Sequence, residues 1–164
     1  MDDRVELELP ARPEYLAVVR SVVTEIAEAA TSLPVGRIDD LRLAVTEACA
    51  NAIDATRRVN SSSEPKRRVT RASVDGVADG IISLSCALDG ESIVVEVHDS
   101  AGGFDPDALV PHPPVTKPDR LKFERGLGVP LMRALADEVT FRQENGGTTV
   151  RLVLSADGRP RADG

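Results

Sequence analysis

The 164-residue chain is predicted to be an α+β protein, a two-layer α/β sandwich in which helices cover one face of a mixed sheet. Three observations predict this class. Apolar residues recur at helical spacing in two long N-terminal segments, they alternate or cluster in short segments elsewhere, and turn-forming residues separate the short segments. The expected order is strand, helix, helix, strand, strand, helix, strand, strand.

The N-terminal segment is predicted to form a strand and then a helix. Hydrophobic residues alternate with glutamates in residues 5–9, which is typical of a half-buried strand, and Pro10 ends it. Pro13 suits the first turn of a helix, where an N–H group would have no intrahelical partner. Apolar residues then recur at helical spacing up to Ala30.

A second helix is predicted from about Ile38 to Arg58, after a break at Pro34-Val35-Gly36. Asp39 and Asp40 would lie near the positive end of its dipole. The helix has an apolar stripe that would face the sheet, formed by Leu41, Val45, Ala48, Cys49, Ala52 and Ile53.

The middle of the chain is predicted to hold a long polar loop and a hairpin. Residues 60–80 are polar and include a short basic run, which is read as a solvated loop or as a contact for an acidic partner or a phosphate. Residues 81–88 and 92–99 have the composition of strands, and Asp89-Gly90 between them is typical of a tight hairpin turn.

The last third is predicted to hold a long loop, a helix and a second hairpin. The loop covers the proline-rich residues 104–124, and the helix runs from Gly126 to about Asp137. Residues 139–141 and 148–154 are read as strands that Asn145-Gly146-Gly147 joins by a turn.

Composition limits the location and the class of partner. Residues 1–155 are expected to form one domain and residues 156–164 a disordered tail. An acidic N-terminus and the lack of an apolar run of about 20 residues predict a cytoplasmic protein without a membrane segment. The net charge of -7 disfavours direct nucleic-acid binding. Cys49 and Cys86 lack metal-type spacing and are interpreted as buried, inert thiols.

Glu47 and Asn51 are candidates for chemistry. Their spacing of four places both side chains on one face of the second helix, beside the apolar stripe and at the rim of the core. A carboxylate and a carboxamide together can hold a hydrated Mg²⁺ ion when phosphates supply further oxygens, and the carboxylate can also accept a proton. For this pair taken alone, a solvated polar face is the alternative.

Two further segments contain candidate nucleotide contacts. Asp99 ends a hydrophobic strand, so its carboxylate can point into a cavity and accept a hydrogen bond from an exocyclic amine; an ordinary acidic turn is the alternative. Gly126 and Gly128 would let backbone amides approach phosphates, and a flexible hinge would explain them equally well. Cations precede these glycines at Lys117, Arg120, Lys122 and Arg125.

Together, these segments resemble the GHKL ATP-binding superfamily, which has the Bergerat fold, and more narrowly the anti-sigma-factor serine kinases. Residues 47–53 match the N-box of that family. Residues 95–106 and 126–137 match its two glycine boxes, and residues 147–150 fit its last strand. The likeness covers roughly residues 5–155.

The resemblance implies a role for each matching residue. Asn51 would ligate Mg²⁺, and Glu47 would be the general base that takes the proton from a substrate serine. Asp99 would bind the amino group of adenine, with support from Thr148. Residues 104–125 would form a lid over ATP. Backbone room for the nucleotide and the lid would come from Gly103, Gly126 and Gly128.

The resemblance also implies the biological role. An ATP- and Mg²⁺-dependent anti-sigma regulator of this kind sequesters a sigma factor and phosphorylates a serine of a STAS-domain anti-anti-sigma protein. Phosphorylation stops that antagonist from binding, so the kinase tunes the release of the sigma factor. Relatives are often homodimers.

Two rival functions stay open at this point. A non-catalytic ATP-binding anti-sigma module is favoured by Ala101, where a glycine is usual, and by Leu127, where an arginine is frequent, whereas retention of Glu47 argues against it. A stand-alone ATPase core of histidine-kinase type would need a phosphoacceptor histidine on a helix. His98 and His112 lie in a predicted strand and a predicted loop.

Overall fold

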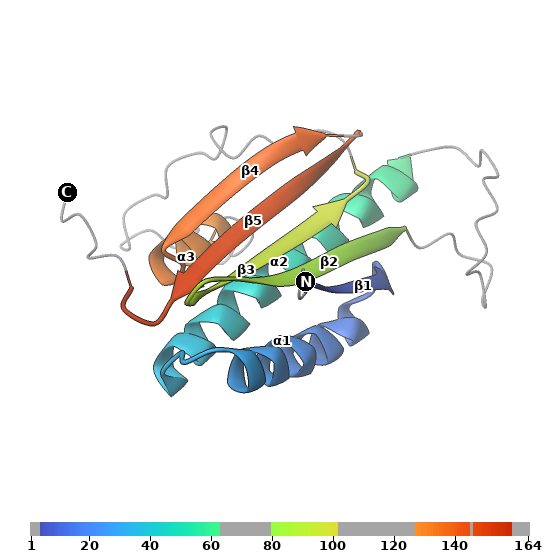
Figure 1. The fold of residues 1–164 in the computed structure, drawn as a ribbon. Helices are drawn as coiled ribbons and strands as arrows, with labels where there is room; N and C mark the ends of the chain where they lie inside the picture. Colours follow the sequence, from blue (N-terminus) through green and yellow to red (C-terminus); the bar gives the residue numbers. More distant parts are fainter. Residues whose placement is uncertain (1–3, 63–79, 102–126, 145, 159–164) are drawn as a thin grey trace, which may run out of the picture.

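The computed structural model describes residues 4–62, 80–101, 127–144 and 146–158, which form a helical layer packed on one face of a sheet (Figure 1). The order of elements agrees with the order predicted from the sequence, with one added 3₁₀ turn. The elements are β1 (Arg4–Pro10), η1 (Pro13–Tyr15), α1 (Leu16–Ala30), α2 (Val35–Ser62), β2 (Ile81–Asp89), β3 (Ser92–Asp99), α3 (Gly128–Leu135), β4 (Glu138–Glu144) and β5 (Gly147–Ser155).

The sheet has the strand order β1-β2-β3-β5-β4, and each of its four described strand pairs is antiparallel. The α+β class and the helical cover on one face are confirmed, but the expectation of a mixed sheet is corrected. A parallel pair would form if β4 returned beside β3 after α3. Instead β5 lies between β3 and β4, and it runs antiparallel to both.

The core lies between the inner face of the sheet and the helices. Helix α2 is central in this layer, and its predicted apolar stripe is buried in full, with exposed fractions of 0–4%. The core cluster is almost wholly aliphatic, as the composition predicts. The residues of the sheet that pack into it include Leu9, Ile82, Leu84, Cys86, Ile93, Val95, Val97, Val150, Leu152 and Leu154.

Helix α2 is longer than predicted, because it begins at Val35 and extends to Ser62. The backbone N–H of Ile38 already donates to the carbonyl of Pro34, so the break lies before Val35. Asp39 and Asp40 therefore fall beyond the first turn, and their predicted place at the positive end of the dipole is wrong. Like the other described helices, the 28-residue α2 lacks the apolar stretch that a bilayer crossing demands.

The predicted turns of both hairpins are observed. Gly90 between β2 and β3 has φ +61°, and Gly146 between β4 and β5 has φ +77°, a backbone conformation that favours glycine. The loops predicted over residues 60–80 and 104–124 fall largely outside the described residues. Ala156 packs against the core, and residues 159–164 are not described, so the expected domain boundary at residue 155 stays a prediction.

Both cysteines are free and buried. Burial raises the pKa of Cys49 to about 12 and that of Cys86 to about 11. Both thiols are therefore protonated at neutral pH, and they are unreactive because only the thiolate is a good nucleophile. The interpretation of both as buried, inert thiols agrees with this environment.

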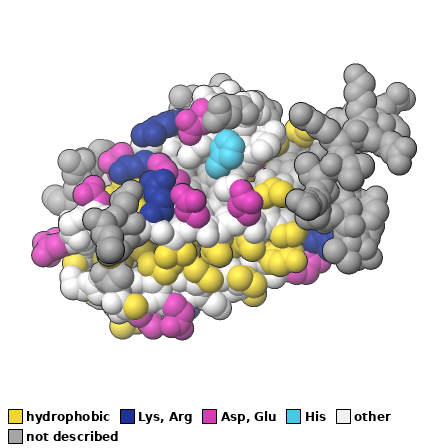
Figure 2. Space-filling view, turned by 45° about the vertical axis from the view of Figure 1, so that its right-hand side comes forward, with side chains coloured by type: hydrophobic (Ala, Val, Ile, Leu, Met, Phe, Trp, Pro, Cys, Tyr) yellow, Lys and Arg dark blue, Asp and Glu magenta, His cyan; other side chains and the backbone are white. Residues whose placement is uncertain are grey.

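The outer face of the sheet carries charged side chains of both signs (Figure 2). Glu96 of β3 lies 3.8 Å from Arg4 of β1 and 3.9 Å from Arg151 of β5, and Arg151 also bonds Glu138 of β4 at 3.2 Å. Charged groups on this face and aliphatic groups on the other explain why the helices cover only one side of the sheet.

One half-buried arginine joins the start of α2 to the far side of the fold. Arg37 donates hydrogen bonds to the carbonyl of Leu135 at 2.8 Å, to Asp137 Oδ1 at 2.6 Å and to the carbonyl of Ser155 at 3.3 Å. Asp137 Oδ2 in turn accepts hydrogen bonds from the backbone and the hydroxyl of Ser155. Arg37 thus ties α2 to the end of α3 and to β5.

Replacing Arg37 with Ala is expected to lower the free energy of unfolding by about 2–3 kcal/mol, because hydrogen bonds to a charged group are lost in a partly buried place. Urea denaturation measures this change. The matched control is Arg42→Ala, since Arg42 forms an exposed ion pair with Asp39 at 2.8 Å and should cost less than about 1 kcal/mol. Equal losses in the two variants would contradict the role given to Arg37.

Candidate functional site

Glu47 and Asn51 of α2 meet the first residue of α3. A Cβ atom built on Gly128 would lie 3.1 Å from Glu47 Oε2, 3.0 Å from Asn51 Nδ2 and 3.3 Å from Asn51 Oδ1. The two side chains are half-buried, and Gly128 is buried. The missing side chain at Gly128 therefore leaves room for the polar ends of both residues beside the start of a helix. Three residues predicted for the site are thereby brought together.

Asp99 and Thr148 form a second pair, on neighbouring strands. They are register partners of β3 and β5, with exposed fractions of 5% and 2%. The backbone N–H of Ala101 donates to Asp99 Oδ1 at 2.9 Å, and that of Thr148 also donates to the carboxylate. Burial outweighs these hydrogen bonds and raises the pKa of Asp99.

The hydroxyl of Thr148 is buried, and it has no hydrogen-bond partner among the residues that the structure describes. A buried polar group without a partner costs free energy. A bound molecule that forms a hydrogen bond with this hydroxyl would remove that cost. Thr148 lies directly beside Asp99, which means that two polar groups are available at one point of the inner sheet face.

Gly147 is required for this pairing. A Cβ atom built there would overlap the carbonyl oxygen of Asp99 and would lie 3.0 Å from Cε1 of His98. A larger residue would push β5 away from β3 at the point where Asp99 and Thr148 meet. The sequence of one strand does not reveal how closely another strand approaches it, so Gly147 is not among the residues predicted for the site.

A small cavity lined by described residues connects Asn51 with the pair Asp99 and Thr148. Its volume is about 20 Å³, enough for roughly one water molecule. Asn51 from α2 and Asp99 and Thr148 from the sheet line it together. Larger hollows of about 560 and 350 Å³ lie over α1 and α2 and on the outer sheet face, and none of the predicted site residues lines them.

The cavity wall includes residues that the sequence analysis did not place in the site. Phe141 of β4 and Val150 of β5 come from the sheet, and three alanines of α2 face them, namely Ala48, Ala52 and Ala55. Alternation along residues 139–141 could have placed Phe141 on the inner face, but only the register of β4 with β5 puts it beside the cavity.

The remaining predicted residues cannot be placed. Gly103, Gly126, the lid segment 104–125 and its four cations fall outside the described residues. Within the described part, no group of three or more His, Cys, Asp or Glu side chains could hold a metal ion. The donor set at α2 nevertheless suits Mg²⁺ bound mainly by phosphates, because Asn51 and Glu47 offer hard oxygen ligands at the same place.

Comparison with known proteins agrees with this geometry. A family model described as a histidine kinase-like ATPase domain matches residues 9–154. The serine-protein kinase RsbW of Bacillus licheniformis is 32% identical over 146 residues, which cover 89% of this chain and 82% of the relative. RsbW of Bacillus velezensis is 31% identical over 160 residues, covering 95% and 88% of the two chains.

A solved structure supports the fold alone. The RsbU and RsbW domains of Rv1364c from Mycobacterium tuberculosis match with a TM-score of 0.57 and 20% identity, over 93% of this chain and 32% of that one. The predicted resemblance to the GHKL superfamily and to its serine kinases is confirmed by the family model and by the relatives. This chain belongs to the family of histidine kinase-like ATPase domains and, within it, to the RsbW serine-protein kinases.

Proposed function

We propose that this protein is a cytoplasmic anti-sigma regulator that uses ATP to phosphorylate a serine of a STAS-domain antagonist and that binds a sigma factor when the antagonist is phosphorylated. The observation that carries the catalytic part is the shared cavity. Asn51 lines the same space as Asp99 and Thr148, and Glu47 lies one helical turn before Asn51. This arrangement supports a single site that extends from the base to the phosphates.

Asp99 and Thr148 form the base end of the proposed site. The Asp99 carboxylate would accept a hydrogen bond from the exocyclic amine of adenine, which guanine lacks at that position. The buried hydroxyl of Thr148 would give the base a second polar contact. A purine needs more room than about 20 Å³, so base binding requires the cavity wall to open.

Asn51 and the start of α3 form the phosphate end. The first N–H groups of α3 have no intrahelical partners and favour negative charge beside Gly128. Asn51 would hold Mg²⁺ through its amide oxygen, and this ion, when bound, supplies neutralisation of phosphate charge. Phosphoryl transfer depends mainly on such positioning and charge neutralisation.

Glu47 would act as the general base. The hydroxyl oxygen of the substrate serine forms a bond to the γ-phosphorus, the bond from that phosphorus to the β–γ bridging oxygen breaks, and ADP leaves. The proton of the serine hydroxyl passes to the carboxylate of Glu47. Its neighbour Gly128 keeps the carboxylate from being covered by a side chain of α3.

The partners follow from the family. The relatives are named serine-protein kinases, and the anti-sigma kinases that this chain resembles act on a STAS-domain protein and a sigma factor. The net charge of -7 supports protein partners over nucleic acid. A homodimer is part of the proposal, since relatives often form one.

The alternative function, a non-catalytic anti-sigma module, is supported by Leu127, which stands where an arginine is frequent. The second departure, Ala101, has less weight, because its backbone N–H still donates to Asp99 at 2.9 Å. The part of the site that needs a backbone donor is therefore intact with alanine at position 101.

The proposed function is tested by transfer of the labelled γ-phosphate of ATP to the STAS-domain protein encoded nearest to this chain. We expect label on a serine of that protein, and we expect its loss when a chelator removes Mg²⁺. In parallel, the sigma factor encoded nearest is tested for binding to the chain. Tight binding of the sigma factor without any labelled serine would establish the non-catalytic module instead.

A further inference from the structure

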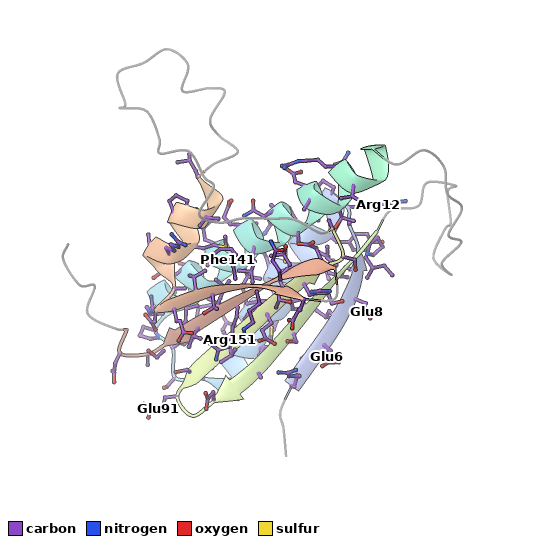
Figure 3. All side chains as sticks on the ribbon, turned by 90° about the horizontal axis from the view of Figure 1, so that it is seen from above. Glu6, Glu8, Arg12, Glu91, Phe141 and Arg151 are labelled. Carbon is purple, nitrogen blue, oxygen red and sulfur yellow. The ribbon has the colours of Figure 1, made fainter. Side chains whose placement is uncertain are left out.

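Phe141 is the largest side chain that lines the cavity, and the site described above gives it no role. The other wall residues are either smaller apolar residues or residues with a role in the proposed site. The apolar ones are three alanines of α2 and Val150, and the others are Asn51, Asp99 and Thr148. Figure 3 labels Phe141 where the sheet meets the helical layer.

Phe141 comes from a different strand than the other residues of the sheet wall. Asp99, Thr148 and Val150 lie on the paired central strands β3 and β5, whereas Phe141 is half-buried on β4, an edge strand of the sheet. Its ring therefore closes the cavity from the edge of the sheet.

A contact with α3 supports the ring in this position. The guanidinium carbon of Arg133 lies 6.0 Å from the centroid of the Phe141 ring, within the range of a cation–π interaction. At an exposed site such a contact contributes on the order of 0.5–1 kcal/mol, which favours the position of the ring in the cavity wall.

The Phe141 ring and the Asp99 carboxylate share one small cavity. Both residues line a space for roughly one water molecule, so a group that enters this space from Asp99 has little room before it reaches the other walls. In the proposed function Asp99 marks the place of the exocyclic amine of adenine. A substituent on that amine would therefore meet the ring of Phe141.

We propose that Phe141 is a specificity-determining residue of the nucleotide site: its ring closes the base end beside Asp99 and excludes adenine nucleotides that carry a bulky group on the exocyclic amine. This inference rests on the proposed function, because it requires the base to lie against Asp99. It adds a selection by size to the selection by hydrogen bonding.

The test compares the dissociation constants of ATP and of N6-benzyl-ATP for the full chain, measured by calorimetry. We expect the wild type to bind the benzyl analogue at least about tenfold more weakly than ATP. Phe141→Ala should reduce this preference for ATP about tenfold or more, and Phe141→Leu, which keeps more of the core packing, should reduce it less. Circular dichroism establishes that both variants are folded.

Val139→Ala is the matched control. Val139 lies two residues earlier on β4, on the same face, and packs against the core without lining the cavity. It should keep the preference of the wild type. An unchanged preference in folded Phe141→Ala and Phe141→Leu, or an equal change in Val139→Ala, would overturn the role of Phe141. Failure of the wild type to bind ATP at all would instead overturn the proposed function.

Discussion

Replacing Glu47 with Gln is expected to reduce serine phosphorylation by roughly 10²–10⁴-fold, the contribution that a general base usually makes. Glutamine keeps the size and polarity of the side chain, so packing against Gly128 should survive. It cannot take the serine proton, because an amide is not a base at neutral pH. The measurement is the initial rate of phosphate transfer at saturating ATP and antagonist protein.

The dissociation constant of ATP shows whether Glu47 acts as a general base or only binds the nucleotide. In Glu47→Gln it should stay within about threefold of the wild type, since the lost function belongs to the transition state. Glu91→Gln, on the exposed β2–β3 turn, is the matched control for removing one carboxylate from the surface. Full phosphotransfer by Glu47→Gln would remove Glu47 from the chemistry.

Much of this site follows from local patterns. The spacing of Glu47 and Asn51 places both on one face of α2, and the end of a hydrophobic strand places Asp99 at the edge of the core. Each of these patterns involves only a few neighbouring residues, so it can be recognised without knowing how the rest of the chain folds. The alternatives left open for each residue taken alone are decided only when the elements are assembled.

The parts that could not be predicted depend on contacts between distant segments. Gly128 has no positive φ, and its importance lies in two side chains of another helix that occupy its free space. Phe141 reaches the cavity only through its register with Val150. Arg37 looks like an ordinary surface arginine until α3 and β5 supply its partners.

The errors in the fold have the same origin. A strand, a helix and a strand in sequence suggest a parallel pair, but the insertion of β5 between β3 and β4 makes every described pair antiparallel. Nothing within either strand specifies its neighbour. The sequence predicts the start of α2 three residues late, because valine and glycine after a proline resemble a break. In the structure Val35 and Gly36 belong to the first turn of the helix.

Replacing Asp99 with Asn should change nucleotide binding and stability in opposite directions. The carboxylate proposed to accept the hydrogen bond of the adenine amine is lost, and a hydrogen bond to a charged group is worth about 1.5–3 kcal/mol. ATP should therefore bind roughly 10- to 100-fold more weakly, whereas GTP, which lacks the amine at that position, should be affected less. Calorimetry with both nucleotides measures the change.

The stability of the same variant should rise at neutral pH. Because burial raises the pKa of Asp99, the folded protein binds the proton of this group more tightly than the unfolded chain does. Stability contributed by Asp99 is then present below the ordinary pKa of about 3.9 and falls as the pH rises through the folded value. An asparagine, which is neutral at every pH, does not carry this cost.

Urea denaturation from pH 4 upward distinguishes this linkage from a general effect of the substitution. The difference in the free energy of unfolding between Asp99→Asn and the wild type should grow in favour of the variant as the pH rises, and should level off above the folded pKa. Asp89→Asn, at the exposed end of β2, is the control for replacing an aspartate with an asparagine on the surface. If Asp99→Asn gains stability and keeps its affinity for ATP, the buried carboxylate has a structural role alone and the base lies elsewhere. If it loses both, the hydrogen bonds from Ala101 and Thr148 outweigh the burial of the charge, and the assigned direction of the pKa is wrong.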